Sequence, residues 1–371
     1  MKVKTETNLN DAWYAQCGNE NDVALSTKIR LSRNLANFPF PSRLSPGENE
    51  RIQAILMDAF NKVDGENFHA INISALDKVS SRIMAEREIL ESELQTEGGI
   101  ILRNDGRFSG TVNVKDHICM SSYTAGFDIE KTYDKVSSFD DKIQKYVQFA
   151  ASYDFGYLNS SLLDSGSGMK ISVRLHLPSL SLLKKIPALV RECAEDGFIL
   201  SASFGSGGAT AITSLNSSGA ALGYFYNLEN FSSVSGSEFE QTASAASEIK
   251  KIIDMERNAR SQVFALLKTD IRNSMKRSMA VARASIFITL REAIDIISML
   301  KFARDLGVLS GIDDEQLHAL LYRIQNGHLE FVMKNGSFKY ENDFNEKPVR
   351  KIEMLRALTL QEAFDNVILT V

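Results

Sequence analysis

Strand-like patterns in this chain stop near residue 240, and this change constrains the fold more than any other feature of the sequence. Before that point, apolar and alternating runs are joined by short turns, with helical stretches between groups of them. The sequence therefore predicts an α+β domain built on an antiparallel sheet flanked by helices, and an all-α C-terminal domain. The expected strands are Gly99–Arg103, Phe108–Val114, His117–Ser122, Lys170–Leu177, Phe198–Phe204 and Ala220–Asn227.

Helix signals place the boundary between the two domains. Ser45-Pro-Gly-Glu48 is a capping box with proline at the first helical position, and Ser138-Phe-Asp-Asp141 indicates a second helix start. We expect a domain at residues 1–267 and a helical C-terminal domain at residues 268–371. The helices expected near and after the boundary are Glu238–Leu267, one from Thr289 to before Gly307, and one from Asp313 to a stop at Gly327.

Composition narrows the functional classes. The net charge of −5 argues against a general nucleic-acid or membrane-surface role. The polar start has no apolar signal region, and no run approaches the ~18–20 apolar residues of a membrane span. Cys17, Cys119 and Cys193 are far apart and lack metal-ligand spacing, which predicts reduced thiols. We therefore expect a cytoplasmic protein without a bound metal.

Two basic strand faces indicate an anion-binding site. Lys28 and Arg30 lie two residues apart, which places them on one face of a strand about 6–7 Å apart. In Lys170–Leu177 polar and apolar residues alternate, so that Lys170, Arg174 and His176 share a face. This spacing suits a polyphosphate. An ordinary solvated polar face is the alternative in both places.

Four longer segments resemble the ATP:guanidino phosphotransferases (phosphagen kinases), most closely the bacterial protein-arginine kinases. They occur in the family's order along nearly the whole chain. The resemblance implies a kinase-like domain at residues 1–267, and a C-terminal domain for dimerisation or phosphoarginine binding at residues 268–371. The segments are Asp22–Leu35, Gly156–Pro178, Ala221–Asn230 and Ile252–Arg260.

The catalytic positions implied by the resemblance have changed. The family supplies its proton-accepting carboxylate from tandem glutamates, and this chain has Val114 and Lys115 there. A guanidinium must give up a proton to attack phosphorus. Valine cannot accept one, and lysine repels a cationic substrate. Ser161 stands at the family's active-site cysteine. The resemblance therefore implies no catalytic residue in this chain.

The arginine clamp that holds ATP in the family is also thinned. Two of its positions are lysines, which keep the charge but lose the bidentate fork, and two have lost the charge. Glu88 stands where the family has a nucleotide-contacting histidine, and Asp164 where it has an asparagine. The clamp positions are Lys28, Arg30, Cys119, Lys170 and Ile212.

The resemblance implies ATP or ADP with Mg²⁺ as the ligand, bound weakly or not at all. Phosphoarginine is a second implied ligand, because Ile352-Glu-Met-Leu-Arg-Ala357 matches a phosphoarginine-binding motif of the protein-arginine kinases at Glu353 and Arg356. The first arginine of that motif is missing. The expected nucleotide- or phosphate-binding residues are Ser26, Lys28, Arg30, Lys170, Arg174 and His176.

Three functions remain open. We favour a catalytically impaired pseudokinase with a regulatory or scaffold role in protein quality control. The alternatives are an active guanidino phosphotransferase with a remodelled active site, and a sensor of nucleotides or phosphoanions. The resemblance implies a homodimer that works with a zinc-binding activator protein and a Clp-type protease. The broad apolar surface of Met299–Leu306 predicts either contact with a second subunit or burial within the domain.

Overall fold

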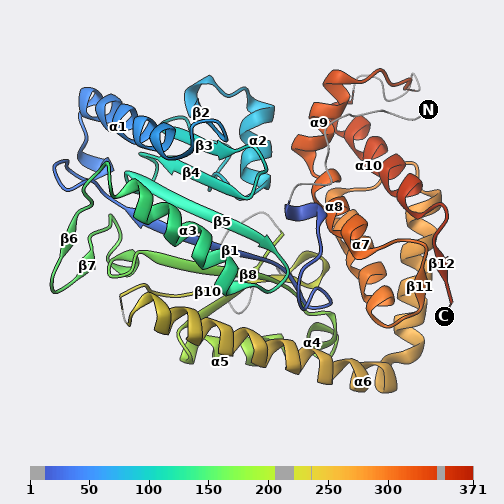
Figure 1. Cartoon of the computed structure of the whole chain (residues 1–371). Coiled ribbons are helices and arrows are strands. Elements are labelled where there is room, and N and C mark those ends of the chain that lie inside the picture. Colours follow the sequence, from blue (N-terminus) through green and yellow to red (C-terminus); the bar gives the residue numbers. More distant parts are fainter. Residues whose placement is uncertain (1–12, 205–220, 235, 341–346, 371) are drawn as a thin grey trace.

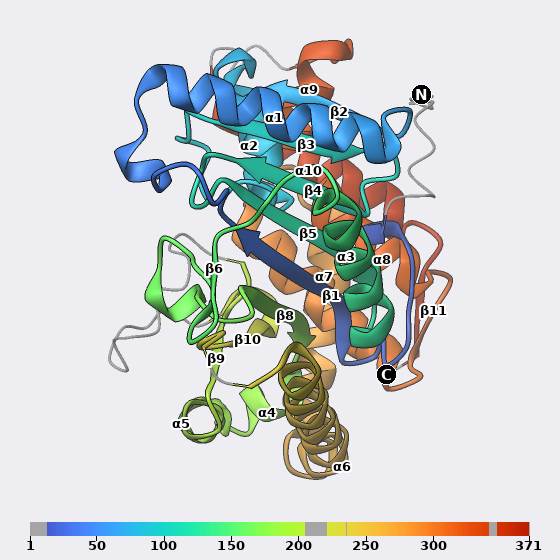
Figure 2. The same cartoon turned by 60° about the vertical axis from the view of Figure 1, so that its left-hand side comes forward.

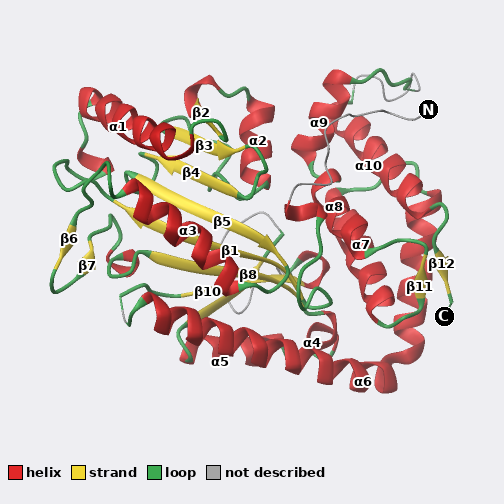
Figure 3. Cartoon of the chain, viewed as in Figure 1, coloured by secondary structure: helices red, strands yellow, loops and turns green. Residues whose placement is uncertain are grey.

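The computed structural model describes residues 13–204, 221–234, 236–340 and 347–370. Its main sheet comprises β1 (Ala24–Arg33), β2 (Phe68–Asn72), β3 (Gly99–Arg103), β4 (Phe108–Val112), β5 (Ile118–Ala125), β8 (Met169–His176), β9 (Phe198–Ala202) and β10 (Phe225–Asn230). The strand order is β2-β3-β4-β5-β1-β8-β10-β9, and every neighbouring pair is antiparallel. The predicted α+β class with an antiparallel sheet is confirmed (Figure 3).

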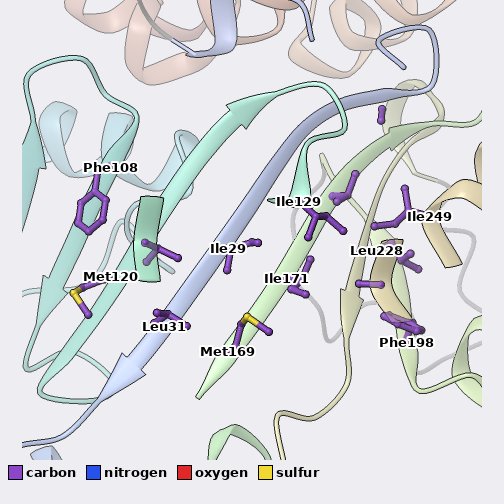
Figure 4. Close-up of a cluster of buried hydrophobic side chains, with 14 of the residues drawn as sticks. Ile29, Leu31, Phe108, Met120, Ile129, Met169, Ile171, Phe198, Leu228 and Ile249 are labelled. Atoms are coloured by element: carbon purple, nitrogen blue, oxygen red, sulfur yellow. The ribbon is translucent and has the colours of Figure 1, made fainter. Parts of the chain in front are cut away.

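One face of the sheet is apolar because its central strands alternate. Ile29 and Leu31 of β1 and Ile171 of β8 are buried in a common core (Figure 4). The residues between them, including Lys28 and Lys170, point to the opposite face. The alternation predicted for Lys170–Leu177 therefore describes β8 correctly, and the sheet has one polar face.

Helices cover the apolar face. The helices α1 (Pro46–Asp64) and α3 (Ile129–Ile143) lie in front of the sheet in Figure 1, and α6 (Glu238–Ala284) runs along its lower edge. The predicted capping box at Ser45 and Glu48 is present at the start of α1. The remaining elements of this part are α2 (Lys78–Glu86), α4 (Pro178–Leu182), α5 (Ile186–Glu195) and the hairpin of β6 (Ala151–Ser152) and β7 (Gly156–Tyr157).

A second group of helices lies beside the sheet (Figures 1 and 2). It shares a core with Leu25, Tyr123 and Phe225 of the sheet, so the two parts pack directly against each other. The prediction that the long helix ends at Leu267 is wrong, because α6 continues through a local kink there and enters the second group. The group contains α7 (Leu290–Asp305), α8 (Asp314–Arg323), α9 (Asn326–Asn335), α10 (Pro348–Phe364) and the pair β11 (Leu309–Ser310) and β12 (Ile368–Leu369).

Two other predicted boundaries are wrong. Helix α3 begins after Asp128, whose side chain accepts a hydrogen bond from the Lys131 amide, and Ser138 lies inside the helix. Gly327 does not stop a helix but lies within α9, where its amide donates to the Glu86 carboxylate. Both residues resemble helix ends by residue type, but each lies inside a helix.

The strand expected at Ala220–Asn227 begins later. Gly223 and Tyr224 both have positive φ, which is incompatible with a regular strand, so β10 starts at Phe225. Ala220 lies outside the described residues.

The apolar surface of Met299–Leu306 is covered by the chain itself. Met299, Leu300, Phe302 and Ala303 are buried in the core shared by the helical group and the sheet, which leaves no broad apolar surface there for a second subunit. Among the helices formed by the described residues, none combines the length and hydropathy of a membrane-spanning segment.

Candidate functional site

The strand register brings four predicted cations onto the polar face of the sheet. In the β1–β8 pair, Arg30 lies opposite Lys170, and Ser26 lies opposite Arg174. Residues directly opposite each other point to the same side, as do residues two apart on one strand. We call Lys28, Arg30, Lys170 and Arg174 the cation face. Cations from two distant segments therefore meet, and their binding of an anion stays a prediction.

Glu88 contacts two members of the cation face. It follows α2, with φ +58°. Its carboxylate accepts from Arg174 Nη2, and its carbonyl oxygen accepts a 2.8 Å hydrogen bond from Lys28 Nζ. Burial opposes ionisation of Glu88, but the charges of Arg174 and Lys28 hold its pKa below the ordinary value. An ionised side chain of the protein therefore neutralises cations that were predicted to hold phosphate.

Arg174 is bonded on every side. Its Nε donates to Ser203 Oγ at 2.6 Å, and its Nη1 donates to the Tyr322 hydroxyl at 2.5 Å. The guanidinium carbon lies 4.7 Å from the ring centre of Phe204, and the side chain is 5% exposed. All three guanidinium nitrogens thus have partners within the chain. An incoming anion would have to displace Glu88 to reach Arg174.

Lys115 and Lys170 are joined by Asp164, which ends the 3₁₀ turn Leu162–Asp164. Asp164 Oδ2 lies 2.7 Å from Lys115 Nζ, and its Oδ1 lies 3.4 Å from Lys170 Nζ. Burial opposes ionisation of Asp164, but the bond from Lys115 and the neighbouring charges keep its pKa below the ordinary value. Lys170 also donates to two backbone carbonyls, those of Asn230 and Phe231. Both lysines are therefore engaged inside the protein.

Arg30 is held more loosely. Its Nη1 lies 3.5 Å from a carboxylate oxygen of Glu91, whose side chain is 68% exposed. Its Nε has no hydrogen-bond partner among the described residues. Cys119, on the neighbouring strand, is buried with its Sγ 3.4 Å from Ser32 Oγ, and burial raises the pKa of its thiol. Cys119 thus adds no charge beside Arg30, and Ile212 lies outside the described residues.

No proton acceptor stands at Val114 and Lys115, the positions where the resemblance places the family's base. Val114 packs against a small apolar cluster that includes Leu90 and Ile100. Asp116 is fully buried, and its Oδ1 accepts hydrogen bonds of 2.7 Å from Asn34 Nδ2 and from the Ser160 amide. The carboxylate that lies against Lys115 is Asp164 from a different loop. The lowered pKa of Asp164 makes its carboxylate a weak base. The arrangement can therefore hold charges in place but is poorly suited to accept a proton.

Three other residues from the sequence analysis lie around the cation face. His176 is fully buried under α7, where its Nε2 lies 2.7 Å from Ser298 Oγ and its ring stacks on Phe225. Burial lowers the pKa of its imidazole. It belongs to the joint between sheet and helices, not to the open part of the cation face. Ser26 is half-buried beside Tyr322 of α8. Ser161 begins the turn that carries Asp164.

The structure gives Arg356 internal partners. This side chain is 1% exposed, and it donates to the carbonyls of Ile324 and Ile288 and to Asn326 Oδ1. Burial lowers its pKa to about 10. Glu353 pairs with Arg350 at 2.9 Å. The two residues predicted to recognise phosphoarginine therefore do not form an open anion site, because the guanidinium of Arg356 ties three segments together.

Sequence reasoning missed the partners of the cation face. Glu88 and Asp164 were identified only as residues unsuited to the predicted chemistry, and the contacts of Glu91 and Tyr322 were not predicted. A basic replacement at Lys115 together with an acidic one at Asp164 was the available signal, since paired changes of opposite sign indicate a new ion pair. Tyr322, which comes from the helical group, left no signal of this kind.

Comparison with known proteins places this geometry in context. Residues 51–259 match the C-terminal catalytic domain of ATP:guanido phosphotransferases, and residues 268–367 match the protein-arginine kinase McsB C-terminal domain. The protein-arginine kinase of Clostridium acetobutylicum is 27% identical over 336 residues, which cover 89% of this chain and 96% of that protein. The protein-arginine kinase of Halothermothrix orenii is 27% identical over 334 residues, with 89% and 93% covered. A crystal structure of lombricine kinase, 18% identical, shares the fold with a TM-score of 0.57 over 66% of this chain and 69% of that one.

Proposed function

Because this chain belongs to the ATP:guanido phosphotransferase family and its C-terminal part is similar to that of the protein-arginine kinases, we propose that it is a pseudokinase. In this proposal it has kept the kinase scaffold and lost phosphoryl transfer. Its role is regulatory or structural, in protein quality control, as a homodimer that contacts a zinc-binding activator protein and a Clp-type protease.

The observation that carries the proposal is the neutralised cation face. Phosphoryl transfer depends on cations that stabilise charge on the transferred group. Here Glu88 is bonded to Arg174 and Lys28, and Asp164 is paired with Lys115 and Lys170. In the proposed pseudokinase, these internal carboxylates take the place of nucleotide phosphates beside the cations.

The missing base supports the same conclusion. A general base contributes typically 10²–10⁴-fold to a rate. Val114 lies in an apolar cluster, and Lys115 is tied to Asp164. An arginine substrate approaching this point would meet a like charge in place of an acceptor.

A phosphorylation assay tests the proposal. Purified protein is incubated with ATP, Mg²⁺ and either free arginine or an arginine-rich protein, and acid-labile phosphoarginine is followed by ³¹P NMR. The protein-arginine kinase of Clostridium acetobutylicum serves as the positive control. We expect no product above a heat-inactivated sample. Phosphoarginine formed at a rate above that background would contradict the pseudokinase.

An active enzyme with a remodelled site is the second candidate, favoured by the position of Asp164. Its carboxylate lies where Lys115 could orient it toward a substrate. If activity is found, the variant Asp164→Asn tests whether Asp164 is the base, because it replaces the carboxylate by a neutral amide of nearly the same shape. Activity retained in Asp164→Asn would exclude Asp164 as the base, whereas a loss of 10²-fold or more would support it.

A sensor of nucleotides or phosphoanions is the third candidate, favoured by the loosely held Arg30. Millimolar ATP, ADP or pyrophosphate should then raise the melting temperature by mass action. The shift should disappear in Arg30→Ala/Lys170→Ala. An equal shift in that double variant would place binding elsewhere.

The homodimer is tested by light scattering at tens of micromolar. One chain has a mass of 41.2 kDa. A mass near twice this value is expected, and a mass near 41.2 kDa would exclude the homodimer and leave only association with other proteins.

A further inference from the structure

A second charged site lies on the other side of the sheet. A groove of about 730 Å³ separates α3 from the turn between β3 and β4. Ser122 of β5 lines this groove, whereas its neighbour Ser121 lies opposite Arg30 on the polar face. The groove is therefore separated from the cation face by the thickness of the sheet.

Basic residues from two elements meet in the groove. Arg103 and Arg107 flank the β3–β4 turn, and Lys131, Lys135 and Lys142 lie on α3. None of the three lysines forms an ion pair with a residue in the described part of the chain. Lys131 and Lys135 are four residues apart on the helix, an arrangement of like charges that costs stability. Asp128 and Asp134 lie three residues before and after Lys131 and offset part of this repulsion, and a bound anion would offset the rest.

The local electrostatics show that these cations converge. Burial lowers the pKa of the Lys135 ammonium, and the charges of Lys131, Arg107 and Arg103 lower it further. Arg103 has a partial partner in Asp105 at 3.5 Å, and Arg107 Nη2 donates to a neutral acceptor, Gln16 Oε1, at 2.9 Å. The Nε of Arg107 is buried and has no partner among the described residues. An anion placed here would relieve repulsion among the cations.

The floor of the groove is aromatic and carries one unpaired hydroxyl. The rings of Phe68, Phe108 and Phe139 contact one another, with centre-to-centre distances between 4.7 and 5.6 Å. Ser122 is fully buried, and its Oγ has no hydrogen-bond partner among the described residues. A buried unpaired hydroxyl costs about 1–3 kcal/mol. Phe108 and Phe139 are buried beneath the groove, whereas Phe68 is half-buried, so an apolar ring of a ligand would lie against Phe68.

Carboxylates on the rim limit the ligand's size. Asp128 caps α3 and Asp64 accepts from Asn67, while Glu130 and Asp134 are exposed. These charges disfavour a long polyanion such as a nucleic acid strand. They leave room for one compact anionic group between the basic residues.

We propose that this groove binds a small aromatic phosphomonoester. Its phosphate lies between Arg107, Lys131 and Lys135, and its ring lies against the half-buried Phe68. A phosphomonoester carries about −1.5 to −2 charges near neutral pH, which balances the three cations better than a single carboxylate does. The inference is independent of the proposed function, because no residue of the cation face takes part.

Phenyl phosphate, inorganic phosphate and benzyl alcohol are the probes, and binding to the full chain is measured by calorimetry and by NMR. Phenyl phosphate should bind at least tenfold more tightly than either of the other two. The variant Lys131→Ala/Lys135→Ala should bind it about tenfold or more weakly. Circular dichroism verifies the fold of each variant.

Two control variants locate the binding. Arg191→Ala/Lys250→Ala also removes two cations, from α5 and α6, and should bind phenyl phosphate within twofold of the wild type. Lys28→Ala/Arg30→Ala, on the cation face, should also bind phenyl phosphate within twofold of the wild type, because the groove lies on the other side of the sheet. No binding of phenyl phosphate, or equal binding by the Lys131/Lys135 variant, would overturn the proposal. Inorganic phosphate binding as tightly as phenyl phosphate would overturn the role of the aromatic floor.

Discussion

At the scale of single residues, a few ion pairs balance the charges of the cation face. Glu88 supplies both a carboxylate and a carbonyl oxygen to the cation face. It holds a positive φ, two residues after the end of α2. Glu88 is therefore the residue whose removal should change anion binding most.

Glu88→Gln should increase affinity for ATP. The substitution removes a negative charge from Arg174 and Lys28, which favours an incoming phosphate by about 1 kcal/mol, or roughly fivefold. Without ligand, the melting temperature should fall, because buried Arg174 loses its charged partner. Calorimetry and thermal melts with ATP measure both effects. Glu97→Gln, at an exposed position in the same segment, is the matched control. An unchanged ATP affinity in Glu88→Gln would contradict this role.

At the scale of elements, α2 and α9 approach closely where Gly327 faces Glu86. A Cβ added at Gly327 would lie 2.8 Å from Glu86 Oε2 and about 3.0 Å from Ile83. The Gly327 amide also donates to both Glu86 carboxylate oxygens. This contact fixes α2, and hence Glu88, against the helical group.

Gly327→Ala should destabilise the protein by about 1–3 kcal/mol, because the added methyl group overpacks the contact. Gly47→Ala is the matched control, since Gly47 also lies in a helix and a Cβ there would meet nothing within 4 Å. That control should be neutral or stabilised by up to about 1 kcal/mol. Urea unfolding compares the two. Equal free energies of unfolding would show that α2 and α9 are not tightly joined.

Glu256 connects α6 to α4 and makes stability depend on pH. Its carboxylate accepts hydrogen bonds from the amides of Ser179 and Leu180, yet burial raises its pKa from 4.5 to about 7. Between these values the folded protein binds a proton that the unfolded chain does not. The contribution of Glu256 is therefore fully present below pH 4.5 and is lost as pH rises through 7, a change of about 3 kcal/mol.

The variant Glu256→Gln should lack this dependence, because glutamine does not titrate. We expect the stability difference, wild type minus variant, to fall by about 3 kcal/mol between pH 4.5 and pH 7. Chemical unfolding across that range measures it. Glu195→Gln, at an exposed position at the end of α5, should show a constant difference. A constant difference for Glu256→Gln as well would show that its pKa is ordinary.

At the scale of the whole molecule, the sheet and the helical group are joined by one long helix and by buried polar contacts. Arg174 donates to Tyr322, and His176 lies 2.7 Å from Ser298. Trp13 stacks on Tyr123 of the sheet at 5.3 Å and meets Tyr322 of α8 edge-on at 5.6 Å. The two parts therefore share a core as well as a connection.

The protein should unfold in a single transition despite its two parts. The chain has one tryptophan, and it lies at the joint, so its fluorescence reports on separation of the parts. Fluorescence and far-ultraviolet circular dichroism should give the same urea midpoint. A fluorescence change that precedes the loss of helix would show that the parts separate before they unfold. Tyr322→Phe, which removes a hydrogen bond from Arg174, should lower the shared midpoint.

The sequence by itself determined the features that follow from local pattern. Alternation identified β8, and a capping box identified the start of α1, because side-chain period and helix caps depend on neighbouring residues. The amino acids at Val114 and Lys115 also showed directly that a carboxylate base is absent there. These are properties of residue type, which no fold can change.

Only the tertiary structure decided which partners these charged residues contact. Arg174 meets Glu88 from 86 positions away and Tyr322 from 148 positions away, and no local pattern encodes such contacts. The same holds for Arg356, which pattern matching assigned to an anion and which packing buries among backbone carbonyls. A charged side chain takes the partner that burial leaves within reach, and burial is decided by how distant elements pack.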